Sequence, residues 1–385
     1  MQKIYLQPFV ITAFLFHFFL LNAQTENIQT ADSLAAVGNH SEAIEILERH
    51  GGKNEKVLLK LAKYQQAKGL DEKALDNYEK VLEMNPQRIL TSIDYGDLLI
   101  ESGKLEKADS LFGDLIDRYP ENANFQYRMG LIKERQEDKM AEYFYFRAIS
   151  LDSTHLAAIY KVSKTFMKRK KFSNAIQLSK KGLETDANNV SLLSLLAQAY
   201  SVSSQYDKAI PVYERLIRLG EGSSFIYEKL GFAYYRENDF PKAIENFENS
   251  LALEDRNSGT HYNLGKIYNR LGELEKAEQH LLMSILIKKQ PVDSEFLSLG
   301  LTYKKMKEYK KALKYFELAL EENPENERAL LERAIAADAY FEDKNSVLAY
   351  YHNYLDKYES IGNEQMISMA EYRISELKKQ IHLAE

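Results

Sequence analysis

The chain has 385 residues, a net charge of −6, 28% charged residues, and neither Cys nor Trp. The charged fraction excludes a membrane protein with many spans, and the hydrophobic content of 45% excludes a wholly disordered chain. Without Cys there is no disulfide, thiolate metal site or Cys nucleophile. The acidic balance gives no attraction to nucleic acid, so no nucleic-acid partner is expected. Length alone suggests two or three domains of ~150 residues.

Residues 1–23 have the layout of a secretory signal peptide. Lys3 is their only charged residue, an apolar run extends from Phe9 to Leu21, and Ala23 provides a small residue before a cleavage site. The alternative is an uncleaved membrane anchor, but the run is shorter than the ~20 residues that a bilayer requires. We therefore expect export. The mature protein would be periplasmic, outer-membrane-associated or secreted, with no membrane span after signal cleavage.

The rest of the chain contains a repeated pattern with copies 33 to 35 residues apart. Eight copies are marked by an alanine: Ala74, Ala108, Ala141, Ala175, Ala209, Ala243, Ala277 and Ala312. In six of them an aromatic residue follows one helical turn later, such as Phe247 after Ala243. An apolar residue and a small residue precede each alanine by about one helix, as in Leu230-Gly231 and Leu264-Gly265. Gly69, Gly103 and Gly272 fall at predicted helix ends, where a left-handed residue is favoured.

This pattern resembles the tetratricopeptide repeat, a helix–turn–helix unit of ~34 residues with L-G-x2-Y followed by A-x3-F. The resemblance covers residues 24–358. It implies an all-α fold, a right-handed superhelical solenoid of about ten units whose first and last units are degenerate. Residues 359–385 then form a C-terminal capping helix and tail. One face of that helix carries Met366, Ala370, Ile374, Leu377 and Ile381.

The helical period predicts which residues of each first helix face outward. Over residues 261–271, Tyr268 and Leu271 lie within about 40° of Leu264, so they are predicted to be core. Tyr262, Lys266 and Asn269 lie about 140–200° away, on the opposite face. The resemblance implies that this face lines a concave groove that binds an extended peptide or a helical segment of a partner protein.

Shifting these positions by the repeat length gives a set that we call the groove residues. They are Tyr127, Leu131, Tyr160, Lys164, Glu228, Phe232, Tyr235, Tyr262, Lys266, Asn269, Leu301 and Lys304. Many of them are apolar, which indicates a contact surface. The alternative is that neighbouring first helices bury part of this stripe against each other, and the sequence leaves both interpretations open.

Cations also cluster within this acidic chain. Eight cations and no acid lie between Lys161 and Lys181. We call five of them the basic run: Lys161, Lys168, Arg169, Lys170 and Lys171. Such a patch could bind an anionic envelope component, either a lipid headgroup or a polysaccharide. The alternative, which we favour, is a solvated turn between two helices.

Motifs for catalysis are missing from the sequence. It contains no H-E-x-x-H, no G-x-S-x-G and no P-loop, and its eight His are scattered. We expect no enzyme activity, no cofactor and no metal. The sequence predicts a non-enzymatic protein–protein interaction scaffold of the bacterial cell envelope with an unidentified protein or peptide partner. The alternative is a binding protein for an anionic envelope component through the basic run.

Overall fold

The computed structural model describes residues 26–50, 54–289 and 291–384, and within them the regular structure is helical, without strands. The all-α prediction is therefore confirmed, whereas the predicted signal peptide lies outside the described residues. The chain divides into two compact units, Met1–Thr165 and Phe166–Glu385. The boundary between them falls inside α9 (Leu156–Lys168).

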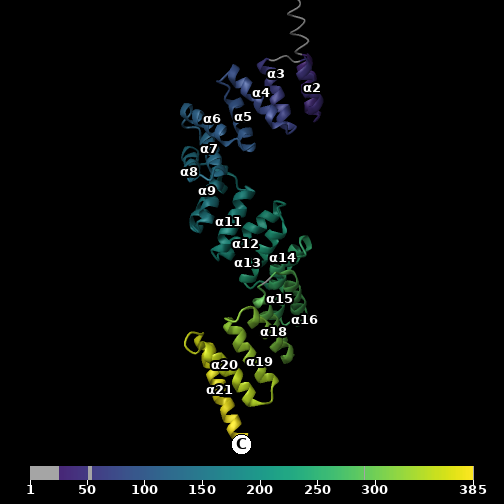
Figure 1. The fold of residues 1–385 in the computed structure, drawn as a ribbon, viewed down its shortest axis with the longest axis vertical. Helices are drawn as coiled ribbons and strands as arrows, with labels where there is room; N and C mark the ends of the chain where they lie inside the picture. Colours follow the sequence, from purple (N-terminus) through teal and green to yellow (C-terminus); the bar gives the residue numbers. More distant parts are fainter. Residues whose placement is uncertain (1–25, 51–53, 290, 385) are drawn as a thin grey trace, which may run out of the picture. The chain divides into compact units, whose positions relative to one another are not determined.

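In unit 1, first and second helices alternate along the chain and neighbours in sequence pack together (Figure 1). The first helices are a segment at residues 26–36, α3 (Glu55–Ala67), α5 (Ile89–Glu101), α7 (Ala123–Arg135) and most of α9. The second helices are α2 (His40–His50), α4 (Asp71–Met84), α6 (Leu105–Arg118) and α8 (Ala141–Leu151).

Unit 2 continues the same alternation. Its first helices are α11 (Val190–Val202), α13 (Ser224–Arg236), α15 (Ser258–Leu271), α17 (Asp293–Lys305) and α19 (Glu327–Tyr340). Its second helices are α10 (Phe172–Thr185), α12 (Tyr206–Arg218), α14 (Phe240–Leu253), α16 (Leu274–Ile287), α18 (Tyr309–Glu322) and α20 (Lys344–Tyr358). The C-terminal helix α21 (Glu364–Ala384) packs on α20 through a face that includes the buried Ala370, Ile374 and Leu377.

The core is built where a small residue of a first helix meets a large residue of the second. A Cβ added to Gly265 would lie only 2.7 Å from Leu281, and one added to Gly300 only 2.6 Å from Phe316. Leu264, Leu281 and Phe316 are fully buried. The small residues thus let two helix backbones approach closely, while the large residues fill the remaining space.

One expectation about the core is wrong. Leu271 is 46% exposed, because it is the last residue of α15 and the chain turns at Gly272 in the left-handed conformation. Ala141 is only half-buried, because α8 begins at this residue, whereas the other marked alanines lie within their helices and are buried. Among the described residues, no helix combines the length and apolar character needed to cross a bilayer.

Candidate partner-binding surface

The groove residues all lie on first helices, and all but one are half-buried. In unit 1, α7 carries Tyr127 and Leu131, and α9 carries Tyr160 and Lys164, of which Lys164 is exposed. In unit 2 the set is Glu228, Phe232 and Tyr235 on α13, Tyr262, Lys266 and Asn269 on α15, and Leu301 and Lys304 on α17. None is fully buried, so each side chain both touches its own unit and reaches solvent.

In unit 1 the aromatic groove residues are engaged by their neighbours. The ring centroid of Tyr127 lies 5.8 Å from that of Tyr145 and 4.9 Å from that of His155. Burial raises the pKa of Tyr127. Lys164 Nζ lies 5.9 Å from the Tyr160 ring centroid. These contacts favour a packing role for Tyr127 over a role as an anchor for a partner.

Cations on the first helices of unit 1 pair with carboxylates on neighbouring first helices. Arg128 on α7 donates two hydrogen bonds to Asp97 on α5, of 2.7 and 2.8 Å. Lys161 on α9 donates to Glu134 on α7 across 2.5 Å. Glu134 also accepts the hydroxyl of the buried Tyr145 at 2.6 Å. Burial, together with this hydrogen bond, raises the pKa of Tyr145.

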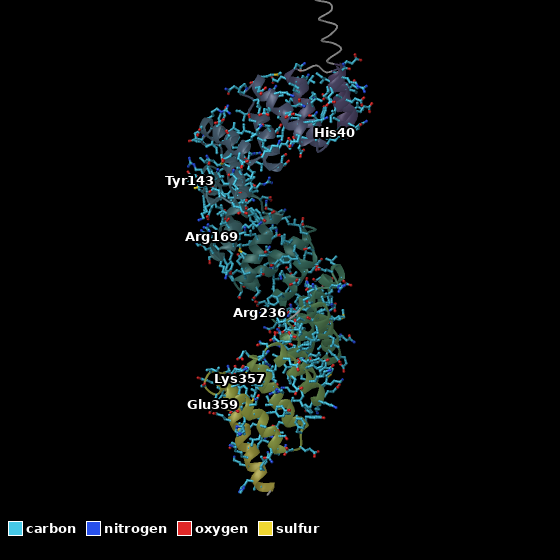
Figure 2. All side chains as sticks on the ribbon, viewed as in Figure 1. His40, Tyr143, Arg169, Arg236, Lys357 and Glu359 are labelled. Carbon is cyan, nitrogen blue, oxygen red and sulfur yellow. The ribbon has the colours of Figure 1, made fainter. Side chains whose placement is uncertain are left out.

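Lys161 therefore differs from the rest of the basic run. Lys161 is half-buried and pairs with Glu134 inside unit 1. Lys168, Arg169, Lys170 and Lys171 are exposed around the start of unit 2 (Arg169 is labelled in Figure 2). Lys170 has a left-handed backbone with φ of 57°, as expected where a helix ends and the chain turns. The run is thus not one uniform patch, because its first member is paired within the fold.

In unit 2 a row of aromatic rings follows the first helices α13 and α15. The ring of Phe232 lies 6.0 Å from that of Tyr206 in an edge-to-face contact and 6.2 Å from that of Tyr235. Tyr235 in turn lies 6.3 Å from Phe240. Tyr206 is buried, and the other three rings are half-buried. Tyr206 and Phe240 are the first residues of the second helices α12 and α14, so the two ends of the row lie on second helices.

Three cations lie on these rings. Arg236 Cζ is 4.8 Å from the Tyr206 ring centroid, and its Nη1 donates to the Tyr206 hydroxyl at 3.0 Å (Figure 2 labels Arg236). Lys266 Nζ lies between two rings, 5.4 Å from Tyr235 and 5.2 Å from Tyr262. Arg270 Cζ is 5.0 Å from Phe240. We call this set the cation–aromatic stripe: Tyr206, Phe232, Tyr235, Arg236, Phe240, Tyr262, Lys266 and Arg270.

Half of the stripe was missed by sequence reasoning, namely Tyr206, Arg236, Phe240 and Arg270. The repeat contains a signal for them. Tyr206 and Phe240 are one repeat apart, as are Arg236 and Arg270. A comparison of equivalent positions at the ends of the first helices and at the starts of the second helices would have identified these four residues.

The remaining groove residues of unit 2 link helices to one another. Asn269 donates to the Thr302 hydroxyl at 2.6 Å and accepts from Lys305 at 2.9 Å, which joins α15 to α17. Lys304 pairs with Glu332 on α19. Glu228 accepts from Asn257 at 2.9 Å. Leu301 packs against a core cluster together with Tyr262. For these residues the interpretation as contacts between first helices is the better supported one.

Groups suited to metal chemistry are not assembled in the part of the chain that the structure describes. No cluster of three or more His, Cys, Asp or Glu could hold a metal ion there. Two histidines do meet, with His261 Nδ1 and His280 Nδ1 2.9 Å apart. Burial, the neighbouring His261 and Lys276 lower the pKa of His280 to about 4.

Comparison with protein families identifies the repeats. Models of the tetratricopeptide repeat match residues 55–88, 94–122 and 295–326. A model described as anaphase-promoting complex, cyclosome, subunit 3 matches residues 202–284. The chain is a tetratricopeptide-repeat protein, and such repeats serve as scaffolds for protein–protein interaction. Comparison with curated protein sequences gives no significant match.

Several solved structures are similar to this chain over part of its length. The C-terminal part of a TPR repeat-containing protein from Cytophaga hutchinsonii is 19% identical with a TM-score of 0.47, covering 57% of this chain and 95% of that one. YrrB, described as a TPR protein with an unusual peptide-binding site, is 19% identical with a TM-score of 0.43, covering 48% and 95%. MamA is 29% identical with a TM-score of 0.41, covering 42% and 95%.

Proposed function

We propose that the protein is a non-enzymatic scaffold of the bacterial cell envelope that binds a peptide or helical segment of a partner protein. The observation that carries the proposal is the cation–aromatic stripe of unit 2. Phe232, Tyr235 and Tyr262 are half-buried on first helices. Contacts with neighbouring side chains fix the positions of these rings, and part of their apolar surface stays accessible to solvent. Aromatic and cationic side chains of this kind dominate the binding energy of many protein interfaces.

The location in the envelope rests on the sequence of residues 1–23, which has the charge and apolar run of a signal peptide. We expect the mature protein to begin at or near Gln24. N-terminal sequencing of the protein recovered from the envelope tests this directly. Retention of residues 1–23 would refute simple export and would favour an anchor.

The binding proposal is tested by replacing Phe232 and Tyr235 with Ala in the full chain. Both side chains contact the core only in part, so we expect far-UV circular dichroism to retain its helical signal. Partner capture from an envelope extract, followed by mass spectrometry, should fall by about ten-fold or more for the specific partner. Unfolding of this variant would show that the two residues belong to the core and would refute the assignment of the surface.

A matched control is available in the same unit. Phe296 and Tyr315 are also half-buried, and their ring centroids are 6.1 Å apart, but they lie outside the stripe on α17 and α18. Replacing both with Ala removes comparable aromatic surface. Capture should persist in this control, and equal loss in both double variants would contradict a specific role for Phe232 and Tyr235.

The alternative function, binding of an anionic envelope component, depends on the basic run. With Lys161 paired to Glu134, it rests on the exposed residues 168–171. Reversing Lys168, Lys170 and Lys171 to Glu should leave protein capture unchanged under our proposal. Loss of all capture in this variant would promote the anion-binding alternative.

A further inference from the structure

Several cations on the first helices and on α21 are matched by carboxylates of a neighbouring repeat. Arg128 pairs with Asp97, Lys161 with Glu134, Lys304 with Glu332, and Arg373 of α21 pairs with Asp338 on α19. Each of these pairs joins helices of neighbouring repeats within one unit. The fold thus neutralises these charges by contacts between adjacent repeats.

The cation–aromatic stripe breaks this pattern. Among the residues that the structure describes, Arg236, Lys266 and Arg270 have no carboxylate within ion-pair distance, and their close contacts are aromatic rings. Helix α15 contains no Asp or Glu, and the only acid of α13 is Glu228. Glu228 is occupied by Lys229 at 2.8 Å and by Asn257 at 2.9 Å.

A ring face holds a cation in place without neutralising it. The attraction comes from the ring quadrupole and amounts to ~0.5–1 kcal/mol at an exposed site, and it leaves N–H donors at the edge of a guanidinium available. Arg236 and Arg270 are exposed and Lys266 is half-buried. Three positioned, unneutralised cations in a chain of net charge −6 are therefore complementary to external carboxylates.

The apolar rings between these cations favour a polypeptide segment over a uniformly charged polymer as the ligand of the stripe. A uniformly charged polymer would contact the cations and leave Phe232, Tyr235 and Tyr262 uncovered. A polypeptide segment in which acidic and apolar side chains alternate would satisfy both, with carboxylates on the cations and apolar side chains on the rings. We propose that the cation–aromatic stripe binds an acidic, apolar-anchored segment of a partner protein, an inference that rests on the proposed function.

The test uses the full chain and a fluorescein-labelled peptide of alternating Glu and Leu, with a Gln–Leu peptide for comparison. We expect the Glu–Leu peptide to raise fluorescence anisotropy on binding, with an affinity that falls as salt increases. The variant R236Q/K266Q/R270Q should bind it at least about ten-fold more weakly. The variant K168Q/K170Q/K171Q removes the same amount of charge outside the stripe and should bind as the wild type does.

Three results would overturn the inference: equal binding of the two peptides, unchanged binding by R236Q/K266Q/R270Q, or an equal loss in K168Q/K170Q/K171Q. Tighter binding of heparin than of the Glu–Leu peptide, weakened equally by R236Q/K266Q/R270Q, would assign the surface to polyanions and also overturn it. The outcome is separable from that of the proposed function. If R236Q/K266Q/R270Q binds the Glu–Leu peptide as the wild type does while F232A/Y235A loses partner capture, only the acidic character of the partner is refuted.

Discussion

A glycine of the first helix faces an aromatic ring of the second helix in several repeats, and the contact leaves no room for a side chain. A Cβ at Gly130 would lie 2.5 Å from the Tyr145 ring. That ring is held by the hydrogen bond from its hydroxyl to Glu134, so it has little freedom to move aside. The aromatic and small positions of the repeat are therefore one packing unit, which explains why they recur together.

We predict that Gly130→Ala destabilises the protein by about 1–2 kcal/mol, because the clash outweighs the gain in helix propensity. The matched control is Gly113→Ala on α6, where an added Cβ has no atom within 4 Å. This control should instead stabilise by about 0.5–1 kcal/mol, since Gly is a poor helix former. Urea denaturation followed by circular dichroism measures both changes. A similar effect of the two substitutions would contradict the packing argument.

The turns illustrate how far single residues could be predicted. Gly69, Gly103 and Gly272 have positive φ, as their type and position indicated. The equivalent positions of other repeats have the same left-handed backbone but carry other residues: Glu137, Lys170, Ser204, Asn238 and Lys307. Residue type alone gives no sign of a left-handed conformation at a lysine. The hydrogen-bonded end of the preceding helix imposes it, so only the repeat register could have indicated it.

At the scale of elements, α15 and α16 are joined by the contact between His261 and His280. His261 Nε2 lies 3.2 Å from the Asp255 carbonyl oxygen, which can only accept, so this nitrogen carries a proton. With that proton on Nε2, His261 Nδ1 is the acceptor of the hydrogen bond from His280 Nδ1–H. Burial disfavours the charged form of His280 and, together with the neighbouring His261 and Lys276, lowers its pKa to about 4.

We predict that this pair makes the protein less stable as pH falls from about 7 to about 4. In this range an unfolded histidine, with a pKa of ~6.5, binds a proton that folded His280 does not bind, so acid favours the unfolded state. The stabilisation is complete above the unfolded pKa and is lost as pH falls toward the folded value. His280→Gln should reduce the acid-induced loss by about 1–2 kcal/mol.

The measurement is the urea midpoint of the wild type and of His280→Gln between neutral and acidic pH. Other groups titrate in the same range, so the difference between the two proteins is the relevant quantity. His382→Gln replaces an exposed histidine of α21 and serves as the control, with a pH dependence like that of the wild type. An unchanged pH dependence in His280→Gln would refute the role of the pair.

At the scale of the whole molecule, each unit is held together by contacts between helices adjacent in the chain. Repeat proteins built in this way respond to damage locally, because each repeat touches only its neighbours. Phe112 in unit 1 and Phe247 in unit 2 are both fully buried, and each fills the space beside a small residue of the preceding first helix, Gly96 and Gly231 respectively.

Replacing either ring with Ala should therefore destabilise mainly the unit that contains it. We predict that Phe112→Ala, at a cost of about 3–5 kcal/mol, accelerates amide hydrogen exchange in α5, α6 and α7 while α13–α15 keep their protection. Phe247→Ala should show the reverse pattern. Hydrogen-exchange mass spectrometry on the two variants is the measurement, and uniform loss of protection in both would contradict local cooperativity.

The fold class, the repeat family and the pattern of the core could be predicted from the amino-acid sequence alone. These follow from a regular spacing of small, aromatic and apolar residues, which any stack of amphipathic helix pairs must satisfy to bury its faces. The same spacing predicted that Phe232, Tyr235 and Tyr262 face away from the core, since the face depends only on the helical period, and in the structure all three are half-buried.

The pairing of charges within the fold, in contrast, could not be predicted and is seen only in the three-dimensional structure. Lys161 and Lys266 are both lysines on the outward part of a first helix, yet Lys161 pairs with Glu134 of the preceding repeat while Lys266 lies between two aromatic rings. The helical period predicts the face on which a side chain lies, but it does not predict which residue of the neighbouring repeat that side chain contacts. That partner depends on helix packing and rotamers, and it separates a lysine that joins two repeats by an ion pair from one that lies on aromatic rings.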